Sequence, residues 1–340
     1  MKKIASLLIL LTLVFSLLVS CNDNDGDKDI DKTVIKIGYM QGPTGMGMAK
    51  LINDNGGING NEKYQFTKFE DVQAATAALL AGQIDMACLP TNNASIIYNT
   101  KDAAVKVLAI NCLNSLFVLT KTGPEITSLE DLEGKTIYTI ANGTPKVILQ
   151  HLLAEKGINA TIKTKAVINN ETKTLAQPSD LASAIIAGAV DIALTPEPVA
   201  TAAPLQVKAQ GKDYAYSTAL DLADAWATVY DTPVAMGCIV ARKDFALEHK
   251  EVTDRFLDEY KASIEFIANK ENADTAAQYI VDAGVLGAVP AAKKSLANLG
   301  TSIAYVDGES MQTTLVAFYS SINPQLIGGK LPDDEFYYKK

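Results

Sequence analysis

The chain carries two similar stretches, LLAGQIDMACLP at residues 79–90 and IIAGAVDIALTP at residues 185–196. Each stretch has an apolar helical end, a glycine, an aspartate and a short apolar run that closes at a proline. Glycine is expected where a helix ends and the backbone turns left-handed, as it must before entering a strand. The repeat therefore predicts two domains of one design, each with a strand that ends at its proline.

A second and weaker repeat precedes the first one, with IGYMQGPT at residues 37–44 and IYTIANGT at residues 137–144. Both repeats occur in the same order and at a similar spacing. A period of about 100 residues is far too long for a solenoid, so two equivalent domains are the better explanation. Short apolar runs alternate with helical patterns for most of the chain, which predicts an α/β fold with mostly parallel sheets flanked by helices.

The same patterns locate the expected elements. Strands are expected at residues 34–40, 64–70, 84–90, 105–111, 116–121, 136–140, 161–167, 192–195 and 214–218. Helices are expected at residues 46–55, 73–81, 93–99, 145–156, 179–187 and 199–210, with a C-terminal helical segment at 250–268, 273–283 and 310–321. Ser128 and Asp131 have the spacing of a helix-capping box, and residues 222–229 are expected to form a loop.

The N-terminus has the features of a lipoprotein signal peptide over residues 1–20. Two lysines precede an apolar run at residues 4–20, which is short for a membrane span of about 20 residues. The run ends in Leu-Val-Ser-Cys, which resembles the bacterial lipobox and implies lipidation of Cys21; a plain signal peptide that happens to end at this cysteine is the alternative. Residues 21–32 are polar and mostly charged, so we expect a flexible tether.

Composition excludes several classes of function. The net charge of −9 argues against a nucleic-acid partner, because such proteins need basic patches. Only two histidines occur, His151 and His249, and neither has a partner at ligand spacing, so neither a metal site nor another cofactor is expected. Cys88, Cys112 and Cys238 are expected as buried thiols, although a bridge between the last two is open in an exported protein.

In open α/β sheets, ligands bind beyond the carboxyl ends of the strands. Four loops are expected there, at residues 42–47, 90–93, 142–145 and 196–198. Helix N-termini in such loops offer free N–H groups and a partial positive charge. The candidate ligand-binding residues are Pro43, Thr44, Gly45, Met46, Thr91, Asn92, Asn93, Asn111, Asn142, Gly143, Thr144, Pro145, Glu197 and Trp226.

Several of these residues have a second interpretation that the sequence leaves open. The hydroxyl and amide side chains bind ligand, cap their own helices, or do both. Met46, together with Met48, lines an apolar wall or packs in the core. Glu197 accepts hydrogen bonds from the ligand or is an exposed charge beside the hinge. Trp226 is an aromatic shelf for a flat ligand or a packing residue.

The order of these motifs resembles that of solute-binding proteins of ABC importers. The segments are residues 35–48, the Gly82-x-Ile84-Asp85 turn, SLEDLEGK at 128–135, the equivalent turn at 188–191 with Glu197-Pro198, and VARKDF at 240–245. The closest group is the nitrate, taurine, aliphatic-sulfonate and thiamine-precursor type. The resemblance implies the type II periplasmic-binding-protein fold, with domain one at residues 33–113 plus 234–340 and domain two at 114–233.

The resemblance also implies a function. A monomeric, lipid-anchored receptor at the outer face of the cell membrane or in the periplasm would capture a small molecule by hinge closure and deliver it to a membrane permease. Neither arginine of the chain lies in a predicted loop, which disfavours a bidentate clamp and favours a flat, nitrogen-containing or weakly anionic ligand. The competing interpretations are an enzyme of the same fold, of the menaquinone- or thiamine-precursor type, and a surface lipoprotein that binds a protein partner.

Overall fold

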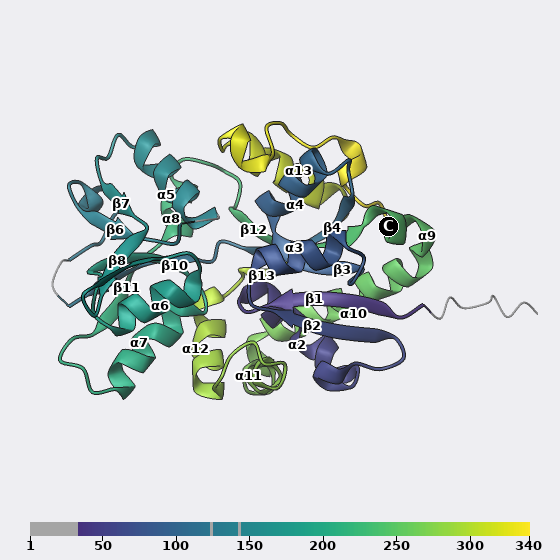
Figure 1. Ribbon diagram of the computed structural model, residues 1–340, viewed down its shortest axis with the longest axis horizontal. Helices are drawn as coiled ribbons and strands as arrows, with labels where there is room; N and C mark the ends of the chain where they lie inside the picture. Colours follow the sequence, from purple (N-terminus) through teal and green to yellow (C-terminus); the bar gives the residue numbers. More distant parts are fainter. Residues whose placement is uncertain (1–32, 123–124, 142–143) are drawn as a thin grey trace, which may run out of the picture. The chain divides into compact units, whose positions relative to one another are not determined.

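The computed structural model describes residues 33–122, 125–141 and 144–340, which build two main sheets (Figure 1). The first sheet has six strands in the order β13-β4-β12-β3-β1-β2. Its strands are β1 (Ile35–Met40), β2 (Tyr64–Phe69), β3 (Met86–Pro90), β4 (Val105–Leu113), β12 (Ala235–Arg242) and β13 (Ile303–Val306). This sheet therefore joins strands from the beginning and from the end of the chain.

The second sheet has five strands in the order β11-β5-β10-β6-β7. Its strands are β5 (Leu116–Lys121), β6 (Thr136–Tyr138), β7 (Thr161–Lys163), β10 (Ile192–Pro196) and β11 (Tyr216–Asp221). A separate hairpin is formed by β8 (Lys165–Ile168) and β9 (Glu171–Thr174). All of these strands come from the middle of the chain.

Helices cover both sheets. The first sheet is accompanied by α2 (Pro43–Asp54), α3 (Val72–Leu80), α4 (Thr91–Thr100), α9 (Lys243–Glu248), α10 (Lys250–Ala268), α11 (Ala273–Asp282), α12 (Val289–Leu299) and α13 (Gly308–Ser320). The second sheet is accompanied by α5 (Thr144–Glu155), α6 (Pro178–Ile186), α7 (Val199–Ala209) and α8 (Leu222–Ala227). The α/β architecture predicted from the sequence is confirmed.

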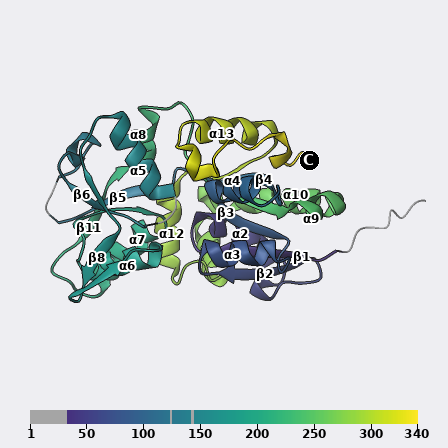
Figure 2. The ribbon, with the colours of Figure 1, turned by 45° about the horizontal axis from the view of Figure 1, so that its top comes forward.

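Alternating side chains of the first sheet supply two separate cores. In β3, Met86 and Cys88 join the core that contains α2 and α10, while Ala87 and Leu89 join the core that contains α13. This alternation is the period of two expected of a strand that is covered on both faces. Figure 2 shows α13 and α4 on one side of this sheet and α2 on the other.

The repeated stretches occupy equivalent places in the two sheets. In both, a helix ends before a glycine with positive φ, which is 70° at Gly82 and 68° at Gly188. A buried strand follows and closes at Pro90 or Pro196. Helix α4 begins at the next residue after Pro90, and α7 begins at Val199, after Glu197 and Pro198. The repeat therefore marks the same helix–strand–helix unit twice, as the sequence predicts.

Both sheets mix parallel and antiparallel pairs, whereas mostly parallel sheets were expected. Strand β1 pairs in parallel with β2 and β3, and β6 pairs in parallel with β7 and β10. However, β12 runs antiparallel to β3 and β4, and β5 runs antiparallel to β10 and β11. The reason is topological: β12 enters the first sheet on the return from the second, between two strands that run the other way.

Several local expectations also need correction. The strand expected at residues 161–167 is split into β7 and β8, and residues 222–227 form helix α8 rather than a loop. Helix α12 was not expected at all. Ser128 and Asp131 do hydrogen-bond, but they order a single 3-10 turn (Glu130–Leu132) instead of starting a long helix.

The two chain segments that join the sheets are hydrogen-bonded to each other. The backbone N–H of Asn114, between β4 and β5, donates to Val234 O over 3.0 Å. The N–H of Val234, just before β12, donates in return to Asn114 Oδ1 over 2.9 Å. Ser302, which precedes β13, donates to Asn114 O over 2.7 Å. Three distant parts of the sequence therefore meet where the chain crosses between the sheets.

Candidate functional site

Loops from both sheets meet at the carboxyl ends of their strands. The first turn of α4 supplies Asn92, and the first turn of α5 supplies Thr144. The Thr144 hydroxyl donates a hydrogen bond of 3.1 Å to Asn92 Oδ1. Two of the four predicted loops are therefore in direct contact. Asn142 and Gly143, like Cys21, lie outside the described residues.

In the first loop, only one side chain reaches the surface. Pro43, Gly45 and Met46 are buried at the start of α2, whereas Thr44 is half-buried. Met46 and Met48 are fully buried in the core beneath α2 and α10, which favours packing over an apolar ligand wall. Thr44 is thus the residue of this loop whose side chain is accessible.

In the second loop, the three polar residues have different environments. The hydroxyl of Thr91 is fully buried and donates to Ala235 O, while Thr91 O accepts a hydrogen bond of 2.6 Å from the Tyr319 hydroxyl. Thr91 therefore ties α4 to the sheet and to α13. Asn92 and Asn93 are half-buried, and each uses its Oδ1 as an acceptor, from Thr144 and Thr76 respectively. The side-chain N–H groups of both asparagines have no hydrogen-bond partner within the described residues.

Asn111 lies beneath the first loop, inside the protein. Its Nδ2 donates to the Tyr260 hydroxyl over 2.9 Å and to Cys88 Sγ over 3.6 Å, and the Cys88 thiol donates to Thr44 O over 3.8 Å. Burial raises the pKa of Cys88 to about 12 and that of Tyr260 above its usual value, so both groups are neutral. This chain of hydrogen bonds fixes the backbone of Thr44 from below.

Glu197 is buried rather than exposed. Its Oε1 accepts from the Thr201 hydroxyl over 2.8 Å and from Asn298 Nδ2 over 3.0 Å. Its Oε2 accepts from the Thr201 N–H over 3.3 Å and from the Ser295 hydroxyl over 3.1 Å. The carboxylate therefore already has four protein donors, two of them on helix α12. Burial raises the pKa of Glu197, and the hydrogen bonds oppose that rise.

The titration of Glu197 should be visible in the stability of the protein. Because its pKa is raised in the fold, its contribution to stability is present below the ordinary carboxyl pKa of about 4.3 and is lost as the pH rises through the raised value. The Glu197→Gln variant should therefore gain stability relative to the wild type as the pH rises. Urea unfolding at a series of pH values measures this difference. The exposed Glu248→Gln is the control, and a pH-independent difference for Glu197→Gln would contradict the prediction.

Trp226 is enclosed by other rings. Its side chain is 1 % exposed, and its Nε1 donates to Thr232 O over 2.7 Å. Its ring centroid lies 4.5 Å from that of Tyr230 and 6.0 Å from those of His151 and Phe318. These contacts favour the packing role over the aromatic shelf.

The helices that begin at the four loops share an electrostatic feature. Helices α2, α4, α5 and α7 have no acidic residue in the first turn, and no capping side chain is described for α2 or α4. Helices α6, α10 and α11 carry an acidic residue there, whereas α3 and α12 do not. Lys146, which no sequence motif singles out, is the single lysine or arginine in the first turns of α2, α4, α5 and α7. The starts of α2, α4 and α5 therefore favour a ligand with acceptor oxygens or partial negative charge, whereas the Glu197 carboxylate already accepts from the Thr201 N–H at the start of α7.

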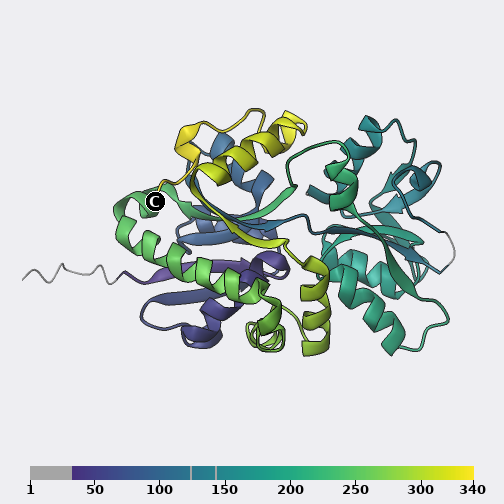
Figure 3. The ribbon, with the colours of Figure 1, turned by 180° about the vertical axis from the view of Figure 1, so that it is seen from behind.

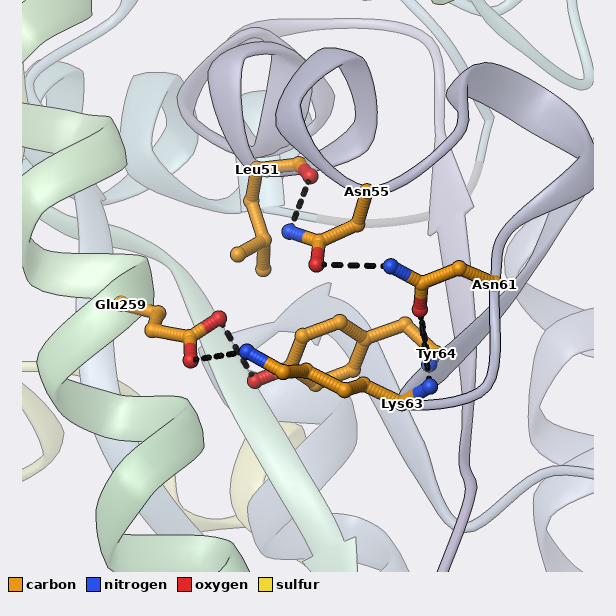
Figure 4. Close-up of polar contacts among 6 residues, drawn as sticks. All are labelled: Leu51, Asn55, Asn61, Lys63, Tyr64 and Glu259. Carbon is orange, nitrogen blue, oxygen red and sulfur yellow. Dashed lines mark hydrogen bonds and ion pairs between the residues drawn. The ribbon is translucent and has the colours of Figure 1, made fainter.

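Two surface cavities lie elsewhere. One, of ≈ 440 Å³, is lined by residues that include Leu80, Arg242 and Leu247. The other, of ≈ 300 Å³, lies between α2 and α10 (Figure 4). Its polar groups are already paired: Glu259 accepts from Lys63 over 3.4 Å and from Tyr64 over 3.0 Å, and Asn61 donates to Asn55 over 3.1 Å. Neither cavity is lined by a residue of the four loops.

Other site types find no support in residues 33–122, 125–141 and 144–340. These residues contain no cluster of three metal-ligating side chains. No helix in this part of the chain has the length and apolar character needed to cross a membrane. Cys88, Cys112 and Cys238 are free and buried, so the bridge left open by the sequence is not formed.

Comparison with known structures shows the fold. The chain is similar to the crystal structure of an ABC transporter from Parabacteroides distasonis, with 20% identity, a TM-score of 0.70, and coverage of 91% of this chain and 99% of that chain. It is also similar to the periplasmic aliphatic sulphonate binding protein SsuA from Escherichia coli (16% identity, TM-score 0.61, coverage 84% and 92%). A third similar structure is the periplasmic nitrate-binding protein NrtA from Synechocystis (14% identity, TM-score 0.57, coverage 83% and 75%). The type II periplasmic-binding-protein fold expected from the sequence is thereby confirmed.

Sequence comparison gives the family. No curated protein sequence matches the chain significantly. The profile of the family described as NMT1/THI5 like matches residues 63–273, which is more than half of the chain. The matched range includes both copies of the first repeat, residues 79–90 and 185–196. The chain therefore belongs to the NMT1/THI5-like family.

Proposed function

We propose that this protein is an extracytoplasmic solute receptor of an ABC importer. The observation that carries the proposal is the contact between Asn92 and Thr144, which joins the first turns of two helices that follow different sheets. A small molecule held there touches both halves of the chain, so its binding would favour their closure. The family and the ABC-transporter neighbours support the same role.

The two halves that would close correspond to the division expected from the sequence. In this proposal, lobe one is residues 33–113 plus 234–340 and lobe two is residues 114–233. The strands of the first sheet come from the former and those of the second sheet from the latter. The bonded crossing at Asn114 and Val234 would then be the hinge.

The proposed ligand is small, flat, and either nitrogen-containing or weakly anionic. Helix N-termini without acidic residues suit acceptor oxygens, and Thr44, Asn92 and Asn93 add hydroxyl and amide donors. No arginine lies in these loops, so a strong bidentate clamp for a sulfonate or carboxylate is not supplied by the chain. This distinguishes the proposed ligand from the sulphonate and nitrate named for two structural neighbours.

The remaining parts of the proposal concern delivery and location. The receptor would act as a monomer, be held at the outer face of the cell membrane or in the periplasm by lipid on Cys21, and deliver its ligand to a permease. The LVSC motif at residues 18–21 supports the anchor, and the extracytoplasmic neighbours support the location. Binding rather than catalysis is proposed, because the polar side chains at the four loops are hydroxyls, amides and one carboxylate that is already fully hydrogen-bonded.

Thermal unfolding of the full chain against a panel of compounds tests this proposal. The panel holds pyrimidines, thiamine fragments, purines, flavins, sulfonates, nitrate and amino acids, added after unfolding and refolding to remove carried-over ligand. A compound at 100 times its Kd should add about 2.7 kcal/mol of stability, a shift of a few degrees in Tm.

A matched pair of variants locates the site. The shift should be lost in Asn92→Ala/Asn93→Ala and retained in Asn53→Ala, an exposed asparagine near the other end of α2. A saturable shift with taurine or nitrate alone would contradict the proposed ligand class. No shift with any compound would favour a protein partner, and conversion of a bound compound to product would favour an enzyme.

A further inference from the structure

Helix α12 belongs to lobe one, and its side chains contact lobe two. It packs against α11 of lobe one, and its Ala292 and Leu299 belong to the core beneath α2 and α10. It also packs against α7 of lobe two. Figures 1 and 3 show α12 beside α7 in both views.

The polar contacts between α7 and α12 converge on one carboxylate. Ser295 and Asn298 of α12 donate to Glu197 over 3.1 and 3.0 Å, and Asn298 also donates to the Thr201 hydroxyl over 2.8 Å. Ser295 is fully buried, and Glu197 is 1 % exposed. The backbone N–H of Glu197 donates to Ser115 O over 3.1 Å, which attaches this carboxylate to the crossing segment.

The hydrogen bonds of Glu197 divide into two groups. The Thr201 N–H and hydroxyl belong to the same lobe as Glu197 and would stay bonded in any arrangement of the lobes. The Ser295 and Asn298 donors belong to the other lobe and would be lost on opening. A buried carboxylate without a charged partner depends on such donors, because burial without them is costly. The two donors on α12 therefore offset the cost of burying the Glu197 carboxylate when the lobes are closed.

We propose that Glu197, Ser295 and Asn298 form a clasp that favours lobe closure without any ligand. Glu197 is then a positioning residue for the closed form, not a ligand contact. A ligand moves an open–closed equilibrium only by its difference in affinity for the two forms. A protein that supplies part of the closure through its own contacts can close on a small ligand that makes few bonds. The clasp rests on the proposed receptor function only in requiring that the two lobes move.

The test measures the distance between the lobes in the absence of ligand. Nitroxide labels are placed at Lys101→Cys on lobe one and Lys156→Cys on lobe two, both exposed positions. The full chain carries Cys21→Ser in detergent, and the other cysteines are buried. Pulsed electron resonance then gives the distance distribution after unfolding and refolding. No compound of the ligand panel is present, so failure of the clasp and failure of the receptor function are separate results.

The decisive variant is Ser295→Ala/Asn298→Ala, which removes the donors on α12 and leaves those of Thr201. We expect the open-to-closed ratio to rise at least tenfold over the wild type. Lys294→Ala is the matched control, because Lys294 is exposed on the same helix. Asn298→Ala alone, at an exposed residue, should give an intermediate ratio and serves if the double variant does not fold. Distance distributions that superimpose on the wild type in both variants would overturn the clasp.

Discussion

Replacing Trp226 by alanine should lower the free energy of unfolding by about 3–5 kcal/mol, the usual loss for a large aromatic side chain removed from a core. Trp226 is 1 % exposed and belongs to a core cluster that also contains Leu149 of α5 and Phe318 of α13. The variant would leave a cavity where three helices meet. It would also leave Thr232 O without the indole N–H that now bonds to it over 2.7 Å.

Chemical unfolding followed by circular dichroism measures this loss. Fluorescence is unsuitable, because Trp226 is the only tryptophan of the chain. Trp226→Phe is the matched control: it keeps a ring in the cavity and should lose clearly less stability. If Trp226→Ala instead unfolds like the wild type but no longer responds to a ligand, the aromatic shelf expected as one alternative from the sequence would be the correct role.

The repeated stretches were predictable because they are local. A helix end, a left-handed glycine and a buried strand follow each other within a few residues, and each leaves its own sign in the sequence. The long helix α10 was likewise expected at its observed bounds, residues 250–268, since its apolar residues recur with helical period. The start of α2 at Pro43 was missed, although proline is favoured in a first helical turn.

The roles of Glu197 and α12 were not predictable, because they depend on contacts between distant segments. Helix α12 is rich in alanine and lysine and has few large apolar residues, and nothing in its sequence indicates which helix it packs against. Its partners on α7 lie about 100 residues away, and nothing local to Glu197 indicates Ser295 or Asn298. Helix α8 had a local signal, since the Asp221 side chain accepts from Ala223 N–H as an N-cap, but a helix of six residues leaves little pattern.

The candidate site contains residues whose environment follows from local sequence and residues whose environment depends on distant contacts. The side chains of Asn92 and Thr144 meet across the loops, and those of Thr44 and Asn93 are half-buried. Their role in ligand binding stays a prediction. Asn111 was expected to face the ligand, yet it is fully buried and bonds to Tyr260 of α10. Only the packing of α10 against the first sheet decides between these environments, and that packing is a property of the whole fold.

Gly45→Ala should cost roughly 3 kcal/mol of stability, the upper part of the range for overpacking, and should abolish ligand-induced stabilisation. A Cβ atom at Gly45 would lie 2.0 Å from Met40 O, 3.2 Å from Met40 C and 3.3 Å from Val285 Cγ2. The nearest obstacle is backbone, so no change of side-chain rotamer relieves it. Relief would require the start of α2 to move away from the end of β1.

Such a movement would reach the candidate site at once. Thr44 precedes Gly45 directly, and its carbonyl accepts the hydrogen bond of 3.8 Å from Cys88 that fixes the loop from below. Met46 and Met48 on the same helix are fully buried and resist a shift of α2. The expected result is therefore a joint loss of stability and of ligand response, measured by unfolding with and without the best compound of the panel.

Gly287→Ala is the control, because a Cβ atom there would have no neighbour within 4 Å. It should be neutral or slightly stabilising, by about 0.4–1 kcal/mol, since it restricts only the unfolded chain. A Gly45→Ala protein as stable as Gly287→Ala would show that α2 can move off β1 freely. If such a protein still bound ligand, the close approach of helix and strand would not be what holds Thr44 in the site. Loss of binding without loss of stability would instead place the effect of Gly45 in the geometry of the loop alone.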